Sequence, residues 1–191
     1  KKKLKKKEVL LLSSGSKLDE YIKEIEKFII KKKPYVIALN TQVKINKKLI
    51  DLYVACNPLK VMSETKQYRN IKSPLVAPTS LMSNQIKKRL AKIKILNFGV
   101  GLKDALFKFY DSCSYIPKLY TVAYALSVVA SGKAKKIYLA GFDGYEKEDR
   151  RFKIVDEIFQ NYSRTKGTPS VTAITPSSYN VQKKSIYTLC F

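Results

Sequence analysis

Short apolar runs alternate with amphipathic segments along most of this chain. Residues 9–12 and 35–39 are continuous apolar runs, which are typical of strands buried on both faces of a parallel sheet. Between them, residues 18–32 place apolar side chains at spacings of three and four, which predicts an amphipathic helix. We expect Ser16 to be the N-cap of this helix, with Asp19 at the capping-box position.

The same alternation continues towards the C-terminus. Further strands are predicted at residues 51–56, 73–78, 93–98, 136–140 and 171–174. Further helices are predicted at residues 80–93, with Ser80 or Ser83 as N-cap, at 117–131 and at 148–163, and a turn at 68–70. Residues 100–114 fit neither pattern. Strands that alternate with helices predict an α/β fold, a single Rossmann-like domain whose mostly parallel sheet carries helices on both faces. We expect residues 1–7 to be a basic lead-in or linker and residues 8–191 to form the domain.

The chain is strongly basic, with 38 Lys and Arg against 15 Asp and Glu and a formal net charge of +23. Such a charge favours polyanionic partners, either nucleic acid or an anionic membrane surface. Only five of the basic residues are arginines, whereas readers of bases and phosphates favour the bidentate arginine fork. The lysines are also spread over the whole sequence. This pattern is typical of solvated faces and counts against nucleic acid, while attraction to an anionic membrane surface or to a polyanionic glycan stays open.

Composition also limits the chemistry. The chain has no His and three widely spaced Cys. Histidine triads and histidine-bound metals are therefore excluded, and the cysteine pattern argues for a reducing compartment and against a disulfide framework or a zinc site. No apolar run approaches the roughly 20 residues of a membrane span. We expect a cytoplasmic protein, or one lying peripherally at the inner membrane, with no metal site and no cofactor.

The loop that joins the first predicted strand to its helix is a candidate phosphate site. Residues 13–16, with the sequence SSGS, offer hydroxyls, one glycine and the N–H groups of a helix N-terminus. The loop lacks both the three-glycine dinucleotide motif and the Walker lysine-threonine pattern, so neither a dinucleotide nor ATP is indicated. The alternative is an ordinary capped β–α turn.

Polar residues also follow other predicted strands, at the edge of the sheet where α/β proteins bind ligands. Asn40 and Asn57 each follow an apolar strand, where they could contact a base or a ribose or shape Asx turns. Asp143 lies in the sequence GFDG, whose glycines would let it approach sugar hydroxyls, although it could equally be a turn aspartate. The hydroxyls of residues 175–179 could bind a phosphate or form a turn at the chain end.

The segments VLLLSSGSKL, VIALN, YVACN, KIYLAGFDGY and ITPSSY, in this order, resemble a Rossmann-like superfamily from bacterial surface-glycan loci. The superfamily includes the lipooligosaccharide sialyltransferases and a related domain found alone or fused behind an aldolase (HMG-CoA-lyase-like) domain. The resemblance covers about residues 9–187 and is most specific at residues 137–143. It implies a nucleotide-sugar-binding domain of lipopolysaccharide or other surface-polysaccharide biosynthesis. Its implied partners are a CMP-sugar, a glycan acceptor and an upstream aldolase domain.

The resemblance also implies roles for individual residues. Ser14, Gly15 and Ser16 would line the phosphate and nucleotide site, Asn40 and Asn57 would lie near the sugar and the cytidine, Asp143 would approach the ribose, and Thr175, Pro176 and Ser177 would lie close to the phosphate or base.

The chain departs from the superfamily at two points that concern catalysis. The catalytic histidine of the sialyltransferases has no counterpart, and Leu119-Tyr120-Thr121 stands where the superfamily has a Ser-Gly pair. If the chain is an active glycosyltransferase, Tyr120 or Asp143 would be the general base. One alternative is a non-catalytic module that accompanies an aldolase-type enzyme. The other is a binder of nucleic acid or a membrane surface that relies on charge alone.

Overall fold

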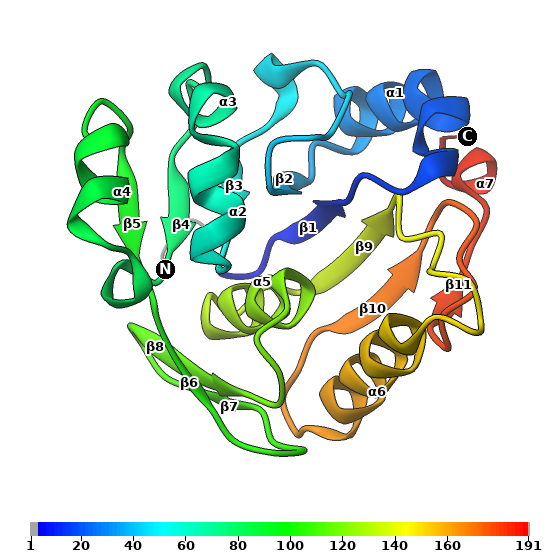
Figure 1. Cartoon of the computed structure of the whole chain (residues 1–191). Helices are drawn as coiled ribbons and strands as arrows, with labels where there is room; N and C mark the ends of the chain where they lie inside the picture. Colours follow the sequence, from blue (N-terminus) through cyan, green and yellow to red (C-terminus); the bar gives the residue numbers. More distant parts are fainter. Residues whose placement is uncertain (1–3, 191) are drawn as a thin grey trace.

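The computed structural model describes residues 4–190 and contains a large parallel β-sheet (Figure 1). Its strands are β1 (Glu8–Leu12), β2 (Tyr35–Leu39), β3 (Leu52–Val54), β4 (Leu75–Ala77), β5 (Ile95–Asn97), β9 (Lys136–Ala140), β10 (Ser170–Ala173) and β11 (Gln182–Lys183). All eight strands are parallel, in the order β11-β10-β9-β1-β2-β3-β4-β5. The predicted α/β class and Rossmann-like parallel sheet are therefore confirmed.

Helices cover both faces of this sheet because successive side chains of each strand point to opposite faces. One face carries α1 (Ile22–Lys32), α2 (Pro58–Ser63), α3 (Thr65–Arg69), α4 (Asn84–Arg89), α7 (Ile186–Cys190) and the 3₁₀ helices η1 (Ser16–Tyr21), η2 (Lys47–Leu49) and η3 (Thr79–Leu81). The other face carries α5 (Thr121–Ser131) and α6 (Arg150–Arg164). In β1, Leu10 and Leu12 join the first core, whereas Val9 and Leu11 join the second.

The segment with no clear pattern forms a small second sheet. Its strands are β6 (Gly99–Leu102), β7 (Lys108–Phe109) and β8 (Cys113–Ile116), in the order β6-β8-β7. Two buried hydrogen bonds join α5 to this region: the Tyr124 hydroxyl donates to the Phe98 carbonyl at 2.5 Å, and the Ser114 hydroxyl donates to that of Ser127 at 2.8 Å. With the large sheet on its other side, α5 is buried along residues 122–130.

The entry to the first helix differs from the sequence prediction. Gly15, not Ser16, is the N-cap, and six residues of 3₁₀ helix precede α1. Ser16 makes no cap hydrogen bond within this turn, and its hydroxyl donates to the Asp143 carboxylate at 3.3 Å. Asp19 forms an ion pair with Lys44 instead of completing a capping box. The local capping prediction was wrong because a carboxylate distant in sequence occupies that role.

The bounds of other helices can also be compared with the sequence prediction. Ser83 is the N-cap of α4, as predicted, and accepts from the Ile86 N–H at 3.3 Å. The turn expected at residues 68–70 is instead the end of α3, and α5 begins at Thr121 rather than at residue 117. The short elements α2, β11 and α7 were not predicted.

The described part of the basic lead-in, residues 4–7, is a turn that packs beside the end of α5. Leu4 is buried, and a Cβ placed on Gly132 would lie 2.6 Å from its side chain. The Lys6 N–H donates to the Lys133 carbonyl at 3.0 Å, and the Lys135 N–H donates to the Lys7 carbonyl at 2.8 Å. Residues 1–3 lie outside the described residues.

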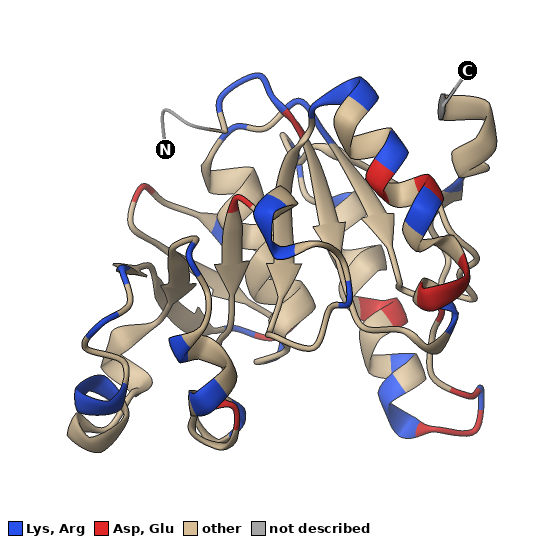
Figure 2. Cartoon of the chain, turned by 90° about the horizontal axis from the view of Figure 1, so that it is seen from above, with Lys and Arg blue, Asp and Glu red and all other residues tan. Residues whose placement is uncertain are grey.

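Charged residues are found on helices and loops around the sheet, with acidic residues between many of the basic ones (Figure 2). Within residues 4–190, no helix is long and apolar enough to cross a membrane.

Candidate functional site

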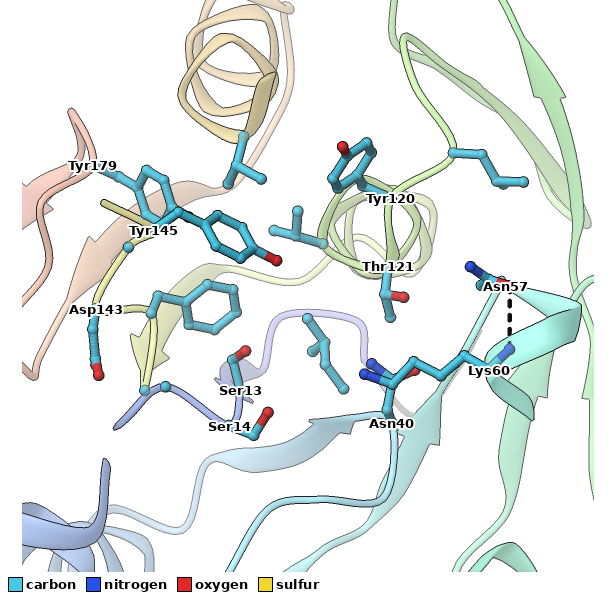
Figure 3. Close-up of a pocket in the computed structure, with 18 residues that line it drawn as sticks. Ser13, Ser14, Asn40, Asn57, Lys60, Tyr120, Thr121, Asp143, Tyr145 and Tyr179 are labelled. Carbon is cyan, nitrogen blue, oxygen red and sulfur yellow. Dashed lines mark hydrogen bonds between the residues drawn. The ribbon is translucent and has the colours of Figure 1, made fainter. Parts of the chain in front are cut away.

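A pocket of about 620 Å³ opens at the carboxyl ends of the central strands (Figure 3). It lies beside β1 and β9, where the strand order reverses between β1–β5 and β9–β11. Open α/β sheets bind ligands at such switch points, and roughly 300–1,000 Å³ is usual for small-molecule sites. The lining residues are Ser13, Ser14, Gly15, Leu39, Asn40, Asn57, Lys60, Leu119, Tyr120, Thr121, Val122, Gly141, Phe142, Asp143, Gly144, Tyr145, Val155 and Tyr179.

The two sides of the pocket differ in chemistry (Figure 3). One side is aromatic, with Tyr120, Tyr145 and Tyr179. Tyr179 is held in place because its ring stacks on the Phe152 ring, with the two ring centroids 5.4 Å apart and an interplanar angle of 17°. Aromatic faces of this kind can stack on a nucleobase. The other side is polar and carries Ser14, Asn40, Asn57 and Lys60, which suit hydroxyl and phosphate groups.

The N-terminus of α5 opens into the pocket. Tyr120 is its N-cap and makes no side-chain capping bond, and Thr121 and Val122 line the pocket. The N–H groups of the first turn and the positive end of the helix dipole are therefore directed towards the pocket. Behind this turn, the Cys56 thiol donates to the Thr121 hydroxyl at 3.8 Å. Burial raises the pKa of Cys56 to about 11, so it stays a neutral thiol and a poor nucleophile.

Asn40 lines the pocket, and its side-chain oxygen is buried. It has a left-handed backbone, with φ 59°, and follows β2 directly. Its buried Oδ1 has no hydrogen-bond partner among residues 4–190. Because such a group normally finds a partner, the vacant acceptor suits a hydroxyl or amino group of a ligand.

A buried carboxylate fixes the loop that follows Asn40. The side chain of Glu64 accepts from the Thr41 hydroxyl at 2.7 Å, the Thr41 N–H at 3.3 Å and the Gln42 side chain at 3.0 Å. The Lys60 amino group lies 3.7 Å from the same carboxylate. Glu64 thus links the Asn40 loop to α2, so that both polar edges of the pocket are held together.

Asn57 serves as the N-cap of α2. Its side chain accepts from the N–H groups of Leu59 at 3.0 Å and Lys60 at 3.3 Å, as the turn-forming interpretation anticipated. This cap sets the start of α2, from which the Lys60 side chain extends into the pocket on the side of Asn40 (Figure 3).

Asp143 lies at one end of the pocket, with its carboxylate directed away from the Tyr120 ring (Figure 3). Its Oδ2 accepts from the Lys17 N–H at 2.5 Å and from the Ser16 hydroxyl. It therefore caps η1 from the loop after β9. Its Oδ1 is buried without a hydrogen-bond partner among the described residues.

Glycines allow the loops after β1 and β9 to touch. The Gly15 N–H donates to the Gly141 carbonyl at 2.9 Å, and a Cβ on Gly15 would lie 2.5 Å from that oxygen. Gly141 has φ 74°, and its Cβ would lie 2.3 Å from the Ser13 carbonyl. The GFDG sequence thus brings two backbones together at the edge of the pocket.

The structure brings together Ser14, Gly15, Asn40, Asn57, Tyr120 and Asp143 of the sequence-predicted residues, but not the others. Ser16 is absent from the pocket lining. Thr175, Pro176 and Ser177 line a separate, smaller pocket of about 290 Å³ near α7. The Thr175 hydroxyl accepts from the Gly141 N–H at 3.0 Å and so supports the loop after β9 from behind.

Sequence reasoning missed Lys60, Thr121 and Tyr145 as lining residues, whereas Tyr179 belongs to the predicted turn at residues 175–179 and does line the pocket. Two signals were present: Lys60 follows the helix-starting Asn-Pro pair, and Tyr145 extends the GFDG segment. Within the described residues, no group of three or more Cys, Asp or Glu is arranged to hold a metal ion.

The fold and pocket define an α/β protein of Rossmann-like topology with a ligand-sized site at its switch point. No protein-family model matches the sequence, and a search of curated proteins finds no significant match.

Proposed function

We propose that this chain is a cytoplasmic nucleotide-sugar-binding domain of bacterial surface-polysaccharide biosynthesis, and that its ligand is a CMP-sugar or a close analogue. The observation that carries the proposal is the combination, in one switch-point pocket, of an open helix N-terminus, a polar side and an aromatic side. A nucleotide-sugar has matching parts: an anionic phosphate, hydroxyl-rich sugars and a planar base.

The arrangement suggests how such a ligand would lie. The phosphate would sit against the first turn of α5 and the Lys60 amino group, where backbone N–H groups and a cation stabilise negative charge. The Asn40 Oδ1 would accept a hydrogen bond from a sugar hydroxyl or a base amino group. The base would stack along the tyrosine side.

Glycosyl transfer is a further possibility for the same pocket. The oxygen of an acceptor hydroxyl would form a bond to the anomeric carbon of the donor sugar and lose its proton to a base. The bond from that carbon to the phosphate oxygen would break, and CMP would leave with the negative charge. Of the two candidate bases, Tyr120 is the better placed, because the Asp143 carboxylate already caps η1. This engagement of Asp143 favours the second candidate function, a non-catalytic module that serves an aldolase-type enzyme.

Calorimetric titration with CMP, UMP, AMP and cytidine tests the proposal. We expect CMP to bind and cytidine to bind more weakly, because cytidine lacks the phosphate. Lys60→Ala should weaken CMP binding about tenfold, the usual effect of losing one charge-assisted hydrogen bond. Asn40→Ala should weaken it as well, whereas Lys66→Ala, at an exposed position outside the pocket, is the matched control and should not. Absence of nucleotide binding, or equal effects of Lys60→Ala and Lys66→Ala, would contradict the proposal.

Release of CMP from a CMP-sugar separates the enzyme from the module. If the chain is a transferase with Tyr120 as base, wild type should turn over the donor in the presence of a glycan acceptor, and Tyr120→Phe should not. If it is a module, CMP should bind to both proteins without turnover.

A further inference from the structure

One end of the molecule has an unbalanced charge. Between residues 52 and 103 the chain has ten Lys and Arg but one acidic residue, Glu64. Glu64 is only 4% exposed, and its carboxylate is taken up by Thr41 and Gln42. Nine of the basic residues are exposed: Lys66, Arg69, Lys72, Lys87, Lys88, Arg89, Lys92, Lys94 and Lys103. This stretch therefore adds positive charge to the surface with no exposed acidic side chain to offset it.

The fold gathers much of this charge on one face. The helices α2, α3 and α4 cover the same face of the sheet over its β3–β5 end (Figure 1). The Arg69 guanidinium donates to the Arg89 carbonyl at 3.1 Å, which joins α3 to α4, and α2 packs beside α4. Figure 2 shows that basic residues predominate on these helices. We call the outer surface of residues 58–92 the α2–α4 face.

Exposed apolar side chains lie on the same face. Leu59 is 73% exposed and Met62 39% exposed, one turn apart on α2, and Leu81, in η3 just before α4, is 41% exposed. Single exposed apolar residues are common, but Leu59 and Met62 lie one turn apart on one helix among lysines and so make the α2–α4 face amphipathic. Leu59 also lies between Asn57 and Lys60, which line the main pocket.

We propose that the α2–α4 face docks on an anionic membrane surface. The lysines and arginines would contact lipid phosphates, and Leu59, Met62 and Leu81 would enter the boundary between headgroups and acyl chains, as in interfacial amphipathic elements. The charge complementarity is direct, because the face has no exposed acidic residue. Nucleic acid would use the positive charge but leave the apolar residues in water, so a membrane accounts for more of the surface.

Docking in this way would place the opening of the main pocket beside the membrane, since Asn57 and Lys60 adjoin Leu59 in α2. The docking itself does not depend on the ligand of that pocket. Failure of the membrane proposal and failure of nucleotide binding are therefore separate results.

Co-sedimentation with vesicles tests the docking surface. The chain is mixed with phosphatidylcholine vesicles and with vesicles that also contain phosphatidylglycerol, at low and high salt. We expect binding to the anionic vesicles that weakens as salt rises. The double substitution Lys87→Glu and Lys88→Glu should lower partitioning at least about tenfold, because each basic residue near an anionic surface contributes measurably. Leu59→Ser should lower it without changing the charge.

Two controls match these variants on α1. Lys23→Glu with Lys27→Glu makes the same change in net charge at exposed positions, and Ile30→Ser removes an exposed apolar side chain as Leu59→Ser does. We expect both controls to bind like wild type, and circular dichroism should show that all variants are folded. Three results would overturn the proposal: no binding to anionic vesicles, equal losses in the α1 and α2–α4 variants, or preferential binding to a DNA duplex with no effect of Leu59→Ser.

Discussion

Asp143 shows how one side chain can look like a ligand contact and yet hold the structure together. Its carboxylate accepts from the Lys17 N–H, 126 residues away in sequence, and so ties the loop after β9 to the turn after β1. The local partners that the sequence suggested, Ser16 and Asp19, do not supply the cap. The edge of the pocket therefore depends on a hydrogen bond between two loops that are far apart in the sequence.

Replacing Asp143 should destabilise the fold. Asp143→Ala removes the acceptor of the Lys17 N–H, and loss of a helix cap costs about 1–2 kcal/mol in the free energy of unfolding. Urea unfolding measures this. Asp104→Ala is the control, because Asp104 forms an ion pair with Lys118 at 3.2 Å but its side chain is almost fully exposed. Exposed pairs contribute little, so a cost as large as that of Asp143→Ala would argue against the capping role.

Gly15 is required for space rather than for an unusual backbone angle. Its φ is −60°, which any residue can adopt, but a Cβ would meet the Gly141 carbonyl at 2.5 Å. Gly15→Ala should therefore cost roughly 2–3 kcal/mol through overpacking. At Gly167 the situation is the opposite: φ is 78°, which disfavours a side chain, but an added Cβ would have no atom within 4 Å. Gly167→Ala should cost about 1 kcal/mol from backbone strain alone. Thermal unfolding compares the two, and a smaller loss for Gly15→Ala would contradict the steric explanation.

At the scale of elements, the sequence predicted those that bury a clear face. β1, β2 and β9 are apolar runs buried in the sheet, and α6 has strong helical periodicity. Their hydrophobic patterns therefore predicted them correctly. β11 has two exposed polar residues, and α2 has only six residues, so neither shows a hydrophobic period. Such elements form because neighbouring strands and caps support them, which a local pattern does not contain.

The small sheet of β6, β7 and β8 was not predicted either, because its local sequence pattern does not resemble that of strands. β6 contains two glycines, because a Cβ on Gly101 would lie 2.6 Å from the Tyr115 ring and one on Gly99 would lie 2.9 Å from the Cys113 Cβ. Cross-strand packing therefore produces a sequence that looks like a loop. For the candidate site, the strand-end rule located Ser14, Asn40, Asn57, Asp143 and the turn that carries Tyr179. It did not locate Lys60, which reaches the pocket from within α2.

The contact between α5 and the small sheet leads to a prediction. The buried Tyr124 hydroxyl donates to the Phe98 carbonyl, so Tyr124→Phe leaves a polar backbone group without this donor. We expect the free energy of unfolding to fall by about 1–3 kcal/mol, with faster amide exchange in β6 and β8. The control is Tyr115→Phe, since that ring is well exposed and its loss of a hydroxyl should matter little. Equal effects of the two variants would rule out a special role for this bond.

For the whole molecule, basic residues are spread evenly along the sequence, but the acidic residues that would balance them are not. The parallel sheet places residues 52–103 at one end, and the single acid of that stretch is buried beneath its surface. The asymmetry arises because acidic residues are scarce in this one stretch, which the sheet places at one end, so the composition of the whole chain underestimated it.

A buried cysteine thiol and several buried tyrosine hydroxyls should make the stability of the fold decrease at high pH. Burial raises the pKa of Cys56 from 9.0 to about 11 and that of Tyr179 to about 12, and it also raises the pKa values of Tyr68, Tyr124 and Tyr162. Below the unfolded-state pKa values both states hold these protons, so stability is unaffected there. Above them the unfolded chain loses protons first, and stability falls as pH rises through the folded-state values.

We therefore expect the free energy of unfolding to be level near neutral pH and to decline from about pH 9 upwards. Cys56 alone should account for roughly 2–3 kcal/mol by pH 11, so Cys56→Ala should show a shallower decline. Urea titrations across this pH range provide the measurement. A flat profile up to pH 11 would show that these groups are not held protonated by the fold.

The position of β1 in the middle of the sheet also has a consequence for biosynthesis. β1 pairs on one side with β2, which follows it closely in the sequence, but its other neighbour, β9, begins only at Lys136. Until then, a strand made almost entirely of core side chains has an open hydrogen-bonding edge, a species prone to join other chains. We therefore expect a chain truncated before Lys136 to aggregate, because the edge of β1 stays open until β9 is present.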